Sequence, residues 1–380
     1  MKTRAAVLYS LDNPKPYSHS KPLRIEELEL EPPGPGEVLV EVAGAGLCHS
    51  DLSVINGTRP WPVPLVLGHE AAGIVRETGP EVTGLQPGDH VVFSFVPVCG
   101  TCPQCATGRG SLCEPGVTAN RAGTLLRGTT RFRRHAGLEA QPPLKHHLGV
   151  SGFSQWTVAA QESLVKIPKD IPLETAVLFG CAVMTGVGAV VNTAKLPPGS
   201  SVAVFGMGGV GLSAIMGAKA VGAYPIIAVD LLESKLQLAL RCGATHVVNG
   251  STVDAPAAVR DLTSGGVETA IEAAGHELAI AQAYASTRRG GKAVAIGLPH
   301  PSKMLSIPAV SLIAEEKTLM GSYMGSCVPS RDIPRFLRMH RAGNLPVELL
   351  RSRDITLDQV NEGFDALDRG EVARQVIRFH

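Results

Sequence analysis

A two-domain α/β fold is predicted by a change of pattern along the chain and by one glycine-rich turn. From about residue 23 to about residue 165, short apolar or alternating runs lie between Gly/Pro turns, which predicts an irregular, barrel-like antiparallel domain. From about residue 200, strand patterns recur roughly every 25 residues, with helix-patterned segments between several of them. This alternation predicts right-handed crossovers and a parallel, doubly wound sheet.

The strands of both regions can be read directly from the sequence. The first region has three clear strand segments: EVLVEVAGAG (37–46), AGIVRETG (72–79) and GDHVVFSF (88–95). The second region has six: SVAVFG, PIIAVD, THVVNG, VETAIEAAG, GKAVAIG and KTLMGSY. Six is the number of strands in a full dinucleotide-binding domain. The tail returns to a mixed pattern, with helices predicted near 330–342 and 357–368 and a last strand near 373–379.

Composition argues against two classes of partner. The charge is balanced, with 35 Lys+Arg against 34 Asp+Glu, and aromatic residues make up only 4%, so nucleic acid is not expected to bind. Two uncharged stretches, 175–194 and 196–218, are long enough to span a membrane, but glycines interrupt both and we interpret them as buried core. The first residues lack the apolar segment of a signal peptide, and reduced thiols are typical of the cytoplasm.

Four of the eight cysteines lie in one run, CGTCPQCATGRGSLC, as Cys99, Cys102, Cys105 and Cys113. Two residues separate each of the first three and seven separate the last two, so one loop can surround a single ion. Four thiolates complete the shell of Zn²⁺, which predicts a structural site rather than a reactive one. Disulfides are the alternative, although cysteines this close pair poorly. An iron–sulfur loop would have a different spacing.

The run GMGGVG follows the apolar strand SVAVF and opens a helix pattern. This context predicts that a dinucleotide pyrophosphate binds at the turn formed by Gly206, Gly208, Gly209, Val210 and Gly211. A purely structural glycine turn is the alternative.

Asp230 ends the next strand, nineteen residues after Gly211. A carboxylate there bonds the adenosine ribose and repels a 2′-phosphate, which favours NAD over NADP. Lys235 is close enough along the chain to reach the same ribose, or it is an exposed helix lysine.

Three further metal-ligand candidates are scattered along the chain: Cys48 in GLCHSD, His69 in LGHE and Cys181 in LFGCAVMTG. Two thiolates and one imidazole with an open fourth position would form a catalytic zinc site that polarises an alcohol or carbonyl oxygen. Taken singly, each residue is equally well interpreted as a buried cysteine or a hydrogen-bonded histidine.

These motifs, with LGHEAAGIV and NEGFDAL, occur in the order of the zinc-dependent, medium-chain alcohol dehydrogenases, which the chain resembles from end to end. The resemblance implies a GroES-like catalytic domain over 1–182 with a zinc loop at 95–115. It also implies an NAD-binding Rossmann domain over 183–322 and a return to the catalytic domain over 323–380. A homodimer with NAD and two zinc ions per chain is expected from the same resemblance.

The resemblance also implies site roles. The catalytic zinc would be bound by Cys48, His69 and Cys181, and the structural zinc by the four clustered cysteines. Residues around the catalytic metal would be Ser50 as first proton acceptor, Asp51 as the carboxylate that orients His69, and Glu70 behind the metal. Cofactor contacts would come from His49, Thr185 and Val210. The expected reaction is hydride transfer from a primary alcohol to NAD.

Three positions depart from the family pattern. Ser53 stands where many relatives end the proton relay in a histidine, so His49 or transfer through the ribose to water are alternatives. Asp368 stands where relatives often carry a pyrophosphate-binding arginine, and Arg369 comes one place later. In length the chain resembles the class III, glutathione-dependent formaldehyde dehydrogenase branch. However, Val117 replaces that branch's arginine for the glutathione carboxylate, so glutathione adducts are not expected.

Several interpretations stay open. Trp61, Leu125 and Tyr323 are candidate pocket residues that would favour apolar or aryl alcohols, or they are core residues. The basic stretch 114–147 is a solvated surface loop or a lid over a substrate entrance. An aldehyde dismutase or formaldehyde dehydrogenase on the same fold is an alternative function. A non-catalytic nucleotide-binding relative is disfavoured because the candidate ligands are intact.

Overall fold

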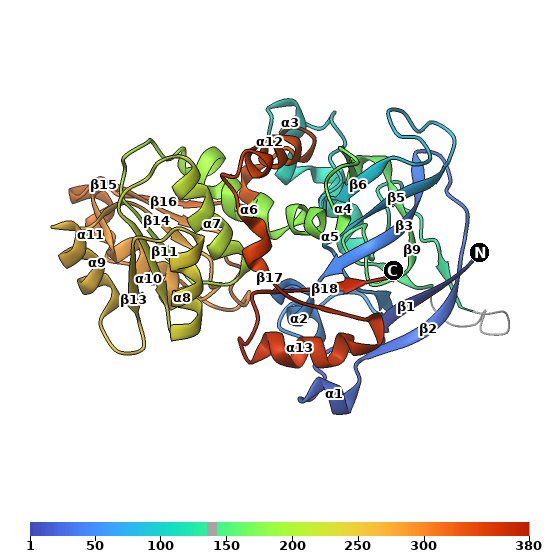
Figure 1. Ribbon diagram of the computed structural model, residues 1–380, viewed down its shortest axis with the longest axis horizontal. Coiled ribbons are helices and arrows are strands. Elements are labelled where there is room, and N and C mark those ends of the chain that lie inside the picture. Colours follow the sequence, from blue (N-terminus) through green and yellow to red (C-terminus); the bar gives the residue numbers. More distant parts are fainter. Residues whose placement is uncertain (135–142, 380) are drawn as a thin grey trace. The chain divides into compact units, whose positions relative to one another are not determined.

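The computed structural model describes residues 1–134 and 143–379 and divides into two compact units (Figure 1). Unit 1 comprises Met1–Cys181, Val328–Ile333 and Arg351–His380, and unit 2 comprises Ala182–Cys327 and Pro334–Leu350. Unit 1 is dominated by antiparallel strands, whereas unit 2 contains a parallel sheet. The predicted α/β fold class is therefore confirmed.

Unit 1 is built on two sheets. The five-stranded sheet has the order β7-β2-β1-β4-β8, with strands β1 (Lys2–Leu8), β2 (Leu23–Leu30), β4 (Leu65–Val66), β7 (Phe132–Arg133) and β8 (Lys145–His146). The seven-stranded sheet has the order β10-β6-β5-β3-β18-β17, and β9 also pairs with β3. Its strands are β3 (Glu37–Gly46), β5 (Ala71–Thr78), β6 (His90–Phe93), β9 (Trp156–Ala160), β10 (Leu164–Ile167), β17 (Arg351–Ile355) and β18 (Arg374–Arg378).

The helices of unit 1 are short and lie between its strands. They are α1 (Tyr17–Ser20), α2 (His49–Ile55), α3 (Pro103–Ala106), η1 (Gly110–Leu112), α4 (Glu114–Ala122), η2 (Gln161–Ser163), α5 (Leu173–Ala176), η3 (Val177–Gly180), η7 (Leu357–Gln359) and α13 (Val360–Asp368). Helix α12 (Pro329–Arg341) begins in unit 1 and ends in unit 2. Among the described residues no single helix is long and apolar enough to cross a membrane. One bent pair, Leu173–Gly180 with Ala182–Ala194, meets the criteria by length and composition only.

Unit 2 contains the six predicted parallel strands. Their order is β13-β12-β11-β14-β15-β16, with β11 (Val202–Phe205), β12 (Ile226–Asp230), β13 (His246–Asn249), β14 (Val267–Glu272), β15 (Thr287–Ala295) and β16 (Thr318–Gly321). Within this unit the first strand, β11, lies in the middle of the sheet. The next two strands, β12 and β13, are added on one side of β11, and β14, β15 and β16 on the other. This is the strand order of a doubly wound nucleotide-binding sheet. In Figure 1 these strands run from green through yellow to orange.

The helices of unit 2 connect and flank this sheet. They are α6 (Ala182–Gly188), η4 (Ala189–Ala194), α7 (Gly209–Ala220), α8 (Glu233–Cys242), α9 (Ala255–Thr263), α10 (Glu277–Ala285), α11 (Ala309–Ala314), η5 (Met324–Ser326) and η6 (Val347–Leu350). Every residue of β11 is buried, because a central parallel strand is covered on both faces. Its side chains belong to an apolar core that includes Ala203, Phe205, Ile227 and Val259.

The C-terminal strand of unit 1 fixes the segment that leads to Cys48. Strand β18 pairs antiparallel with β3, so that Ile377 lies opposite Ala45 and Val376 opposite Gly46. The pairing continues past β3, because the Leu47 backbone N–H donates to Gln375 O at 3.0 Å. A segment more than 300 residues away in sequence therefore sets the position of this cysteine.

Candidate metal centre and cofactor site

The three scattered candidates, Cys48, His69 and Cys181, come together in unit 1. Cys48 lies between β3 and α2, His69 lies between β4 and β5, and Cys181 directly follows η3. Their ligand atoms all lie within 4.8 Å of one another. Each residue is at most 6% exposed. Three segments distant in sequence thus bring two sulfurs and one imidazole to one buried point.

The spacing of these atoms fits a zinc ion. His69 Nε2 lies 3.4 Å from Cys181 Sγ. In a tetrahedral site with Zn–N of about 2.0 Å and Zn–S of about 2.3 Å, the two ligand atoms are about 3.5 Å apart. Three protein ligands leave a fourth position open, which is the pattern of catalytic zinc.

The surroundings shift the pKa values of the two thiols in opposite directions. A hydrogen bond from Cys181 holds the pKa of the Cys48 thiol well below its usual value, against burial, and the Arg374 guanidinium adds to the effect. Arg374 Nη2 donates to Cys48 Sγ at 3.4 Å. The hydrogen bond to Cys48, together with burial, raises the pKa of Cys181 well above its usual value. Both thiols must be deprotonated to bind a metal ion, so binding there would release protons.

Asp51 orients the imidazole of this group. Asp51 Oδ1 lies 3.0 Å from His69 Nδ1, and Oδ2 accepts from the Cys48 backbone N–H at 3.2 Å. The fully buried carboxylate is an acceptor only, so His69 Nδ1 carries the proton and Nε2 presents its lone pair toward the sulfurs. Burial alone would raise the pKa of Asp51, but His69 and His147 lower it. His147 was not singled out as a site residue from the sequence.

Glu70 and Arg374 form a buried pair beside the same cysteines. Burial raises the pKa of Glu70 to about 7, and the nearby Arg374 opposes the rise. Glu70 Oε2 lies 3.3 Å from Arg374 Nε. A Cβ at Gly46 would lie 2.8 Å from the Glu70 carboxyl carbon, so a side chain there would displace this carboxylate. Arg374, which is 2% exposed, was missed from the sequence; its signal was a charged residue inside the apolar last strand.

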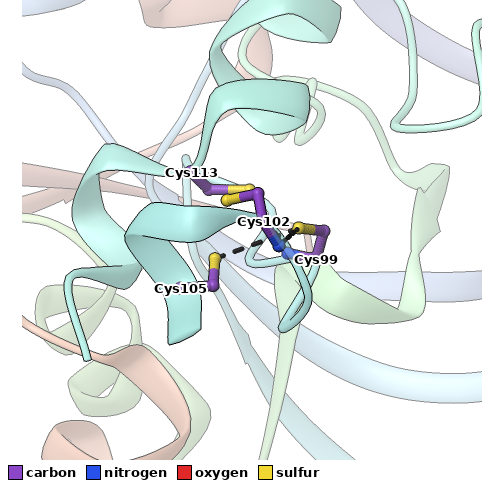
Figure 2. A group of neighbouring side chains, drawn as sticks. All are labelled: Cys99, Cys102, Cys105 and Cys113. Carbon is purple, nitrogen blue, oxygen red and sulfur yellow. Dashed lines mark hydrogen bonds between the residues drawn. The ribbon is translucent and has the colours of Figure 1, made fainter. Parts of the chain in front are cut away.

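The four clustered cysteines also converge on one point, as Figure 2 shows. Their sulfurs all lie within 4.8 Å of one another, and Cys99 Sγ is 3.9 Å from Cys105 Sγ. Two ligands of a tetrahedral Zn–S₄ site are about 3.8 Å apart. Burial would raise the pKa of Cys99, but N–H donors at Thr101 and Cys102 lower it to about 6. The loop is therefore shaped for an ion bound by four sulfurs.

The proton-relay candidates lie on α2, directly after Cys48. His49 is exposed and Ser50 is half-buried in the first turn. Ser53 Oγ donates to His49 O at 2.8 Å, which commits that hydroxyl to the helix backbone. The outer end of the proton relay stays a prediction.

The glycine-rich turn has the two properties that a pyrophosphate site requires. Gly206 has a φ of +91°, and a Cβ there would meet Ala274 N at 2.7 Å. A Cβ at Gly211 would lie 1.8 Å from Gly206 O, so the start of α7 packs directly on the turn. At Gly208, the N-cap of α7, a Cβ would meet nothing within 4 Å. The backbone therefore presents open space at a helix N-terminus, where a phosphate binds.

Asp230 lies at the end of β12, next to this turn. Its Oδ2 accepts from Met207 N at 2.6 Å, and its Oδ1 accepts from Leu231 N and Leu232 N. The carboxylate is thus held against the glycine-rich turn. Lys235 is half-buried in the first turn of α8, and Thr185 is buried in α6.

The three pocket candidates have different surroundings. Leu125 is 1% exposed and packs in the core with Ala5, Phe132 and Leu144, which is the core alternative left open by the sequence. Trp61, by contrast, packs edge-on against His147, with ring centroids 5.7 Å apart. Tyr323 is half-buried in unit 2.

The basic stretch 114–147 is not simply a solvated loop. Arg131 forms an ion pair with Glu37 on β3 and Arg127 forms one with Glu162 on η2, and both histidines at the end of the stretch are buried. Residues 135–142 lie outside the described residues, and the hypothesis that the stretch 114–147 forms a lid stays a prediction.

Known proteins match the chain over its whole length. Residues 34–169 match the family model "alcohol dehydrogenase GroES-like domain", and residues 209–341 match "zinc-binding dehydrogenase". An NDMA-dependent alcohol dehydrogenase of Amycolatopsis methanolica is 41% identical and covers 99% of each chain. An S-(hydroxymethyl)glutathione dehydrogenase of Escherichia coli is 37% identical over 100% of both.

A solved structure agrees with these matches. The crystal structure of benzyl alcohol dehydrogenase from Acinetobacter calcoaceticus superposes with a TM-score of 0.92 at 34% identity, covering 100% of both chains. Full-length similarity at this level, together with both family models, confirms the resemblance found in the sequence. The chain belongs to the zinc-dependent, medium-chain alcohol dehydrogenase family and is an oxidoreductase that acts on alcohols.

Proposed function

We propose that the enzyme interconverts a primary, apolar or aryl alcohol and its aldehyde, with NAD as the redox cofactor. The aromatic rings around the buried ligand group carry this proposal. Phe95 packs edge-on against His69 at 5.6 Å, and Trp61 packs against His147 at 5.7 Å. Aromatic walls favour apolar substrates because they offer dispersion and edge contacts without hydrogen-bonding demands. The benzyl alcohol named for the solved relative is consistent with this substrate class.

In the proposed reaction, different residues bind the metal, orient its ligand and accept the proton. Cys48, His69 and Cys181 would hold the catalytic zinc, which supplies Lewis-acid polarisation of the substrate oxygen. Asp51 keeps the His69 imidazole in the tautomer that can bind a metal. Ser50, two residues after Cys48, would accept the hydroxyl proton of the alcohol. The buried Glu70–Arg374 pair supplies charge behind the metal position.

NAD is proposed over NADP because of Asp230. A 2′-phosphate beside this carboxylate would be repelled, whereas ribose hydroxyls can donate to it. The open space at Gly208 would receive the pyrophosphate, and Thr185 and Val210 would flank the nicotinamide. Lys235 and His49 are additional proposed contacts to the ribose and the pyrophosphate.

The second zinc, the domain limits, the assembly and the location complete the proposal. The four clustered cysteines would bind one structural zinc per chain, which requires reduced thiols and fits the cytoplasm. The proposed domain limits are 1–182 and 323–380 for the catalytic domain and 183–322 for the NAD-binding domain.

The proposed assembly is a homodimer. It is supported by exposed apolar side chains on and near α11, which precedes the edge strand β16 in the chain: Met304, Val310 and Ile313 are 84%, 71% and 82% exposed.

Initial-rate kinetics test this function. Rates with NAD and with NADP are compared for benzylic, terpenoid and aliphatic alcohols and for S-(hydroxymethyl)glutathione. We expect NAD-dependent turnover that is fastest with benzylic or other apolar alcohols. The glutathione adduct should turn over poorly, because Val117 cannot bind a carboxylate. A preference for NADP or for the adduct would contradict the proposal, and aldehyde loss without net NADH would instead indicate a dismutase.

A further inference from the structure

The carboxylate that orients the metal-binding histidine faces a second buried imidazole. His147 Nδ1 lies 3.2 Å from Asp51 Oδ1, the same oxygen that lies 3.0 Å from His69 Nδ1. Asp51 is fully buried and His147 is 1% exposed, so water does not compete for this contact. One carboxylate oxygen thus stands between two imidazoles, only one of which belongs to the proposed ligand set.

The position of His147 is determined by its surroundings. Its backbone N–H donates to Ser151 Oγ at 3.0 Å, and its carbonyl accepts from Val150 N and Ser151 N. Its ring packs perpendicular to both Trp61 and His69, with centroids 5.7 Å and 5.6 Å away. Backbone and ring are therefore both held, and the ring cannot turn away from Asp51 without losing these contacts.

The nitrogen that faces Asp51 has no other hydrogen-bond acceptor. Among the described residues His147 Nδ1 makes no hydrogen bond, although Asp51 Oδ1 lies 3.2 Å away. A buried imidazole N–H left without a partner costs about 1–3 kcal/mol, so the carboxylate is its natural acceptor.

A metal ion held by Asp51, His69 and His147 themselves is a weaker explanation. Their ligand atoms also lie within 4.8 Å of one another. However, binding an ion there would require the lone pair of His69 Nδ1, which the hydrogen bond to Asp51 commits to a proton. The close approach of Asp51 and His147 is therefore better explained as that of an N–H donor to a carboxylate acceptor than as a shared ion site.

We propose that His147 is a positioning residue for the metal centre, because its Nδ1–H binds Asp51 and fixes the carboxylate that orients His69. In this arrangement His147 would share Oδ1 with His69 Nδ1 while the Cys48 N–H donates to Oδ2, and the three contacts together would define the plane of the carboxylate. That plane sets the direction of the His69 ring. The inference rests on the proposed catalytic zinc, and outer partners of zinc-binding histidines change metal affinity by about 10- to 100-fold.

Three variants test this role through metal affinity rather than turnover. His147→Phe keeps an aromatic ring but removes the donor, whereas His147→Asn places an amide N–H near the position of Nδ1. Zinc affinity at the Cys48–His69–Cys181 site is measured by chelator competition on the purified holoenzyme, and the visible spectrum is recorded after cobalt substitution. We expect His147→Phe to weaken zinc about 10- to 100-fold and to change the cobalt spectrum, with His147→Asn restoring both. If His147→Phe fails to fold, His147→Gln replaces it, because its amide reaches the Nε2 position instead.

His146→Phe is the matched control. His146 is adjacent and fully buried, but its Nε2 accepts from Arg131 N and its Nδ1 faces Ser151 Oγ. We expect this variant to lower thermal stability while zinc affinity stays unchanged. Wild-type zinc affinity in His147→Phe would overturn the inference. Equal losses in His147→Phe and His147→Asn, or in His146→Phe, would overturn it as well. A wild-type chain that binds zinc only at the four clustered cysteines would instead refute the proposed function.

Discussion

Replacing Gly208 by alanine should weaken cofactor binding and leave folding stability unchanged. Gly208 has φ −78° and ψ −176°, which any residue adopts, and a Cβ there would meet nothing within 4 Å. Alanine lowers the entropy of the unfolded chain, which stabilises by about 0.4–1 kcal/mol, and it is a poorer N-cap than glycine by a similar amount. The free energy of unfolding should therefore stay within about 1 kcal/mol of wild type.

The same methyl group would occupy the space in which the pyrophosphate approaches the backbone. We expect the Kd for NAD to rise by at least about tenfold, which is about 1.4 kcal/mol. Calorimetric titration measures the affinity and thermal denaturation measures the stability. Gly211→Ala is the contrasting variant, because its Cβ would lie 1.8 Å from Gly206 O and should cost about 3 kcal/mol of stability. Wild-type NAD affinity in Gly208→Ala, or wild-type stability in Gly211→Ala, would refute this account of the turn.

Three further predictions concern other parts of the chain. Cys105→Ser should lower thermal stability, because it breaks the four-sulfur group; a loss of kcat at unchanged stability would show that the two metal groups are wrongly divided. Asp230→Ala should raise KM for NAD and admit NADP, and an unchanged cofactor preference in initial rates would remove Asp230 from the ribose site. Burial would raise the pKa of Asp365, but N–H donors at Ser18 and Tyr17 lower it below its usual 3.8. The ionised carboxylate therefore stabilises the fold above about pH 4, and this contribution is lost as the pH falls through the folded-state pKa. Asp365→Asn should cost about 2 kcal/mol at pH 7 in urea denaturation, and a difference that persists undiminished at pH 2 would contradict the assignment.

The fold was predictable where the hydrophobic pattern was unambiguous. Strand β3 occupies the predicted segment 37–46, and the six strands of unit 2 fall on the six predicted runs. Strands β7 and β8 have two residues each, which is too short for an alternating pattern to be visible. β17 (Arg351–Ile355) was also missed, because RSRDI is mostly polar and pairs at an exposed edge.

The two metal groups differ in how well the sequence alone predicts them, because the ligands of one lie close together in the chain and those of the other do not. The spacing of Cys99, Cys102, Cys105 and Cys113 is a property of one loop, so the sequence alone indicates a shared ion. Cys48, His69 and Cys181 could be grouped from their ligand chemistry, but taken singly each was equally well a buried residue, and the family resemblance supported the grouping. No local spacing links them, because the fold brings them together across more than a hundred residues.

Arg374 and His147 were missed for the same reason. Their functional partners, Glu70 with Cys48 and Asp51 respectively, are distant in sequence. Leu125 was ambiguous for a different reason, since an apolar residue suits a core and a pocket equally.

The zinc content of three proteins tests the central claim most directly. Metal analysis of the purified wild-type chain should give about two zinc ions per chain, one for each cysteine-containing group. Cys181→Ala should retain about one zinc, bind NAD and have no turnover, whereas Cys105→Ser should lose the other zinc and part of its stability. A wild-type protein with a single zinc, or a Cys181→Ala variant with full zinc and undiminished kcat, would contradict the assignment of Cys48, His69 and Cys181 as the reactive centre.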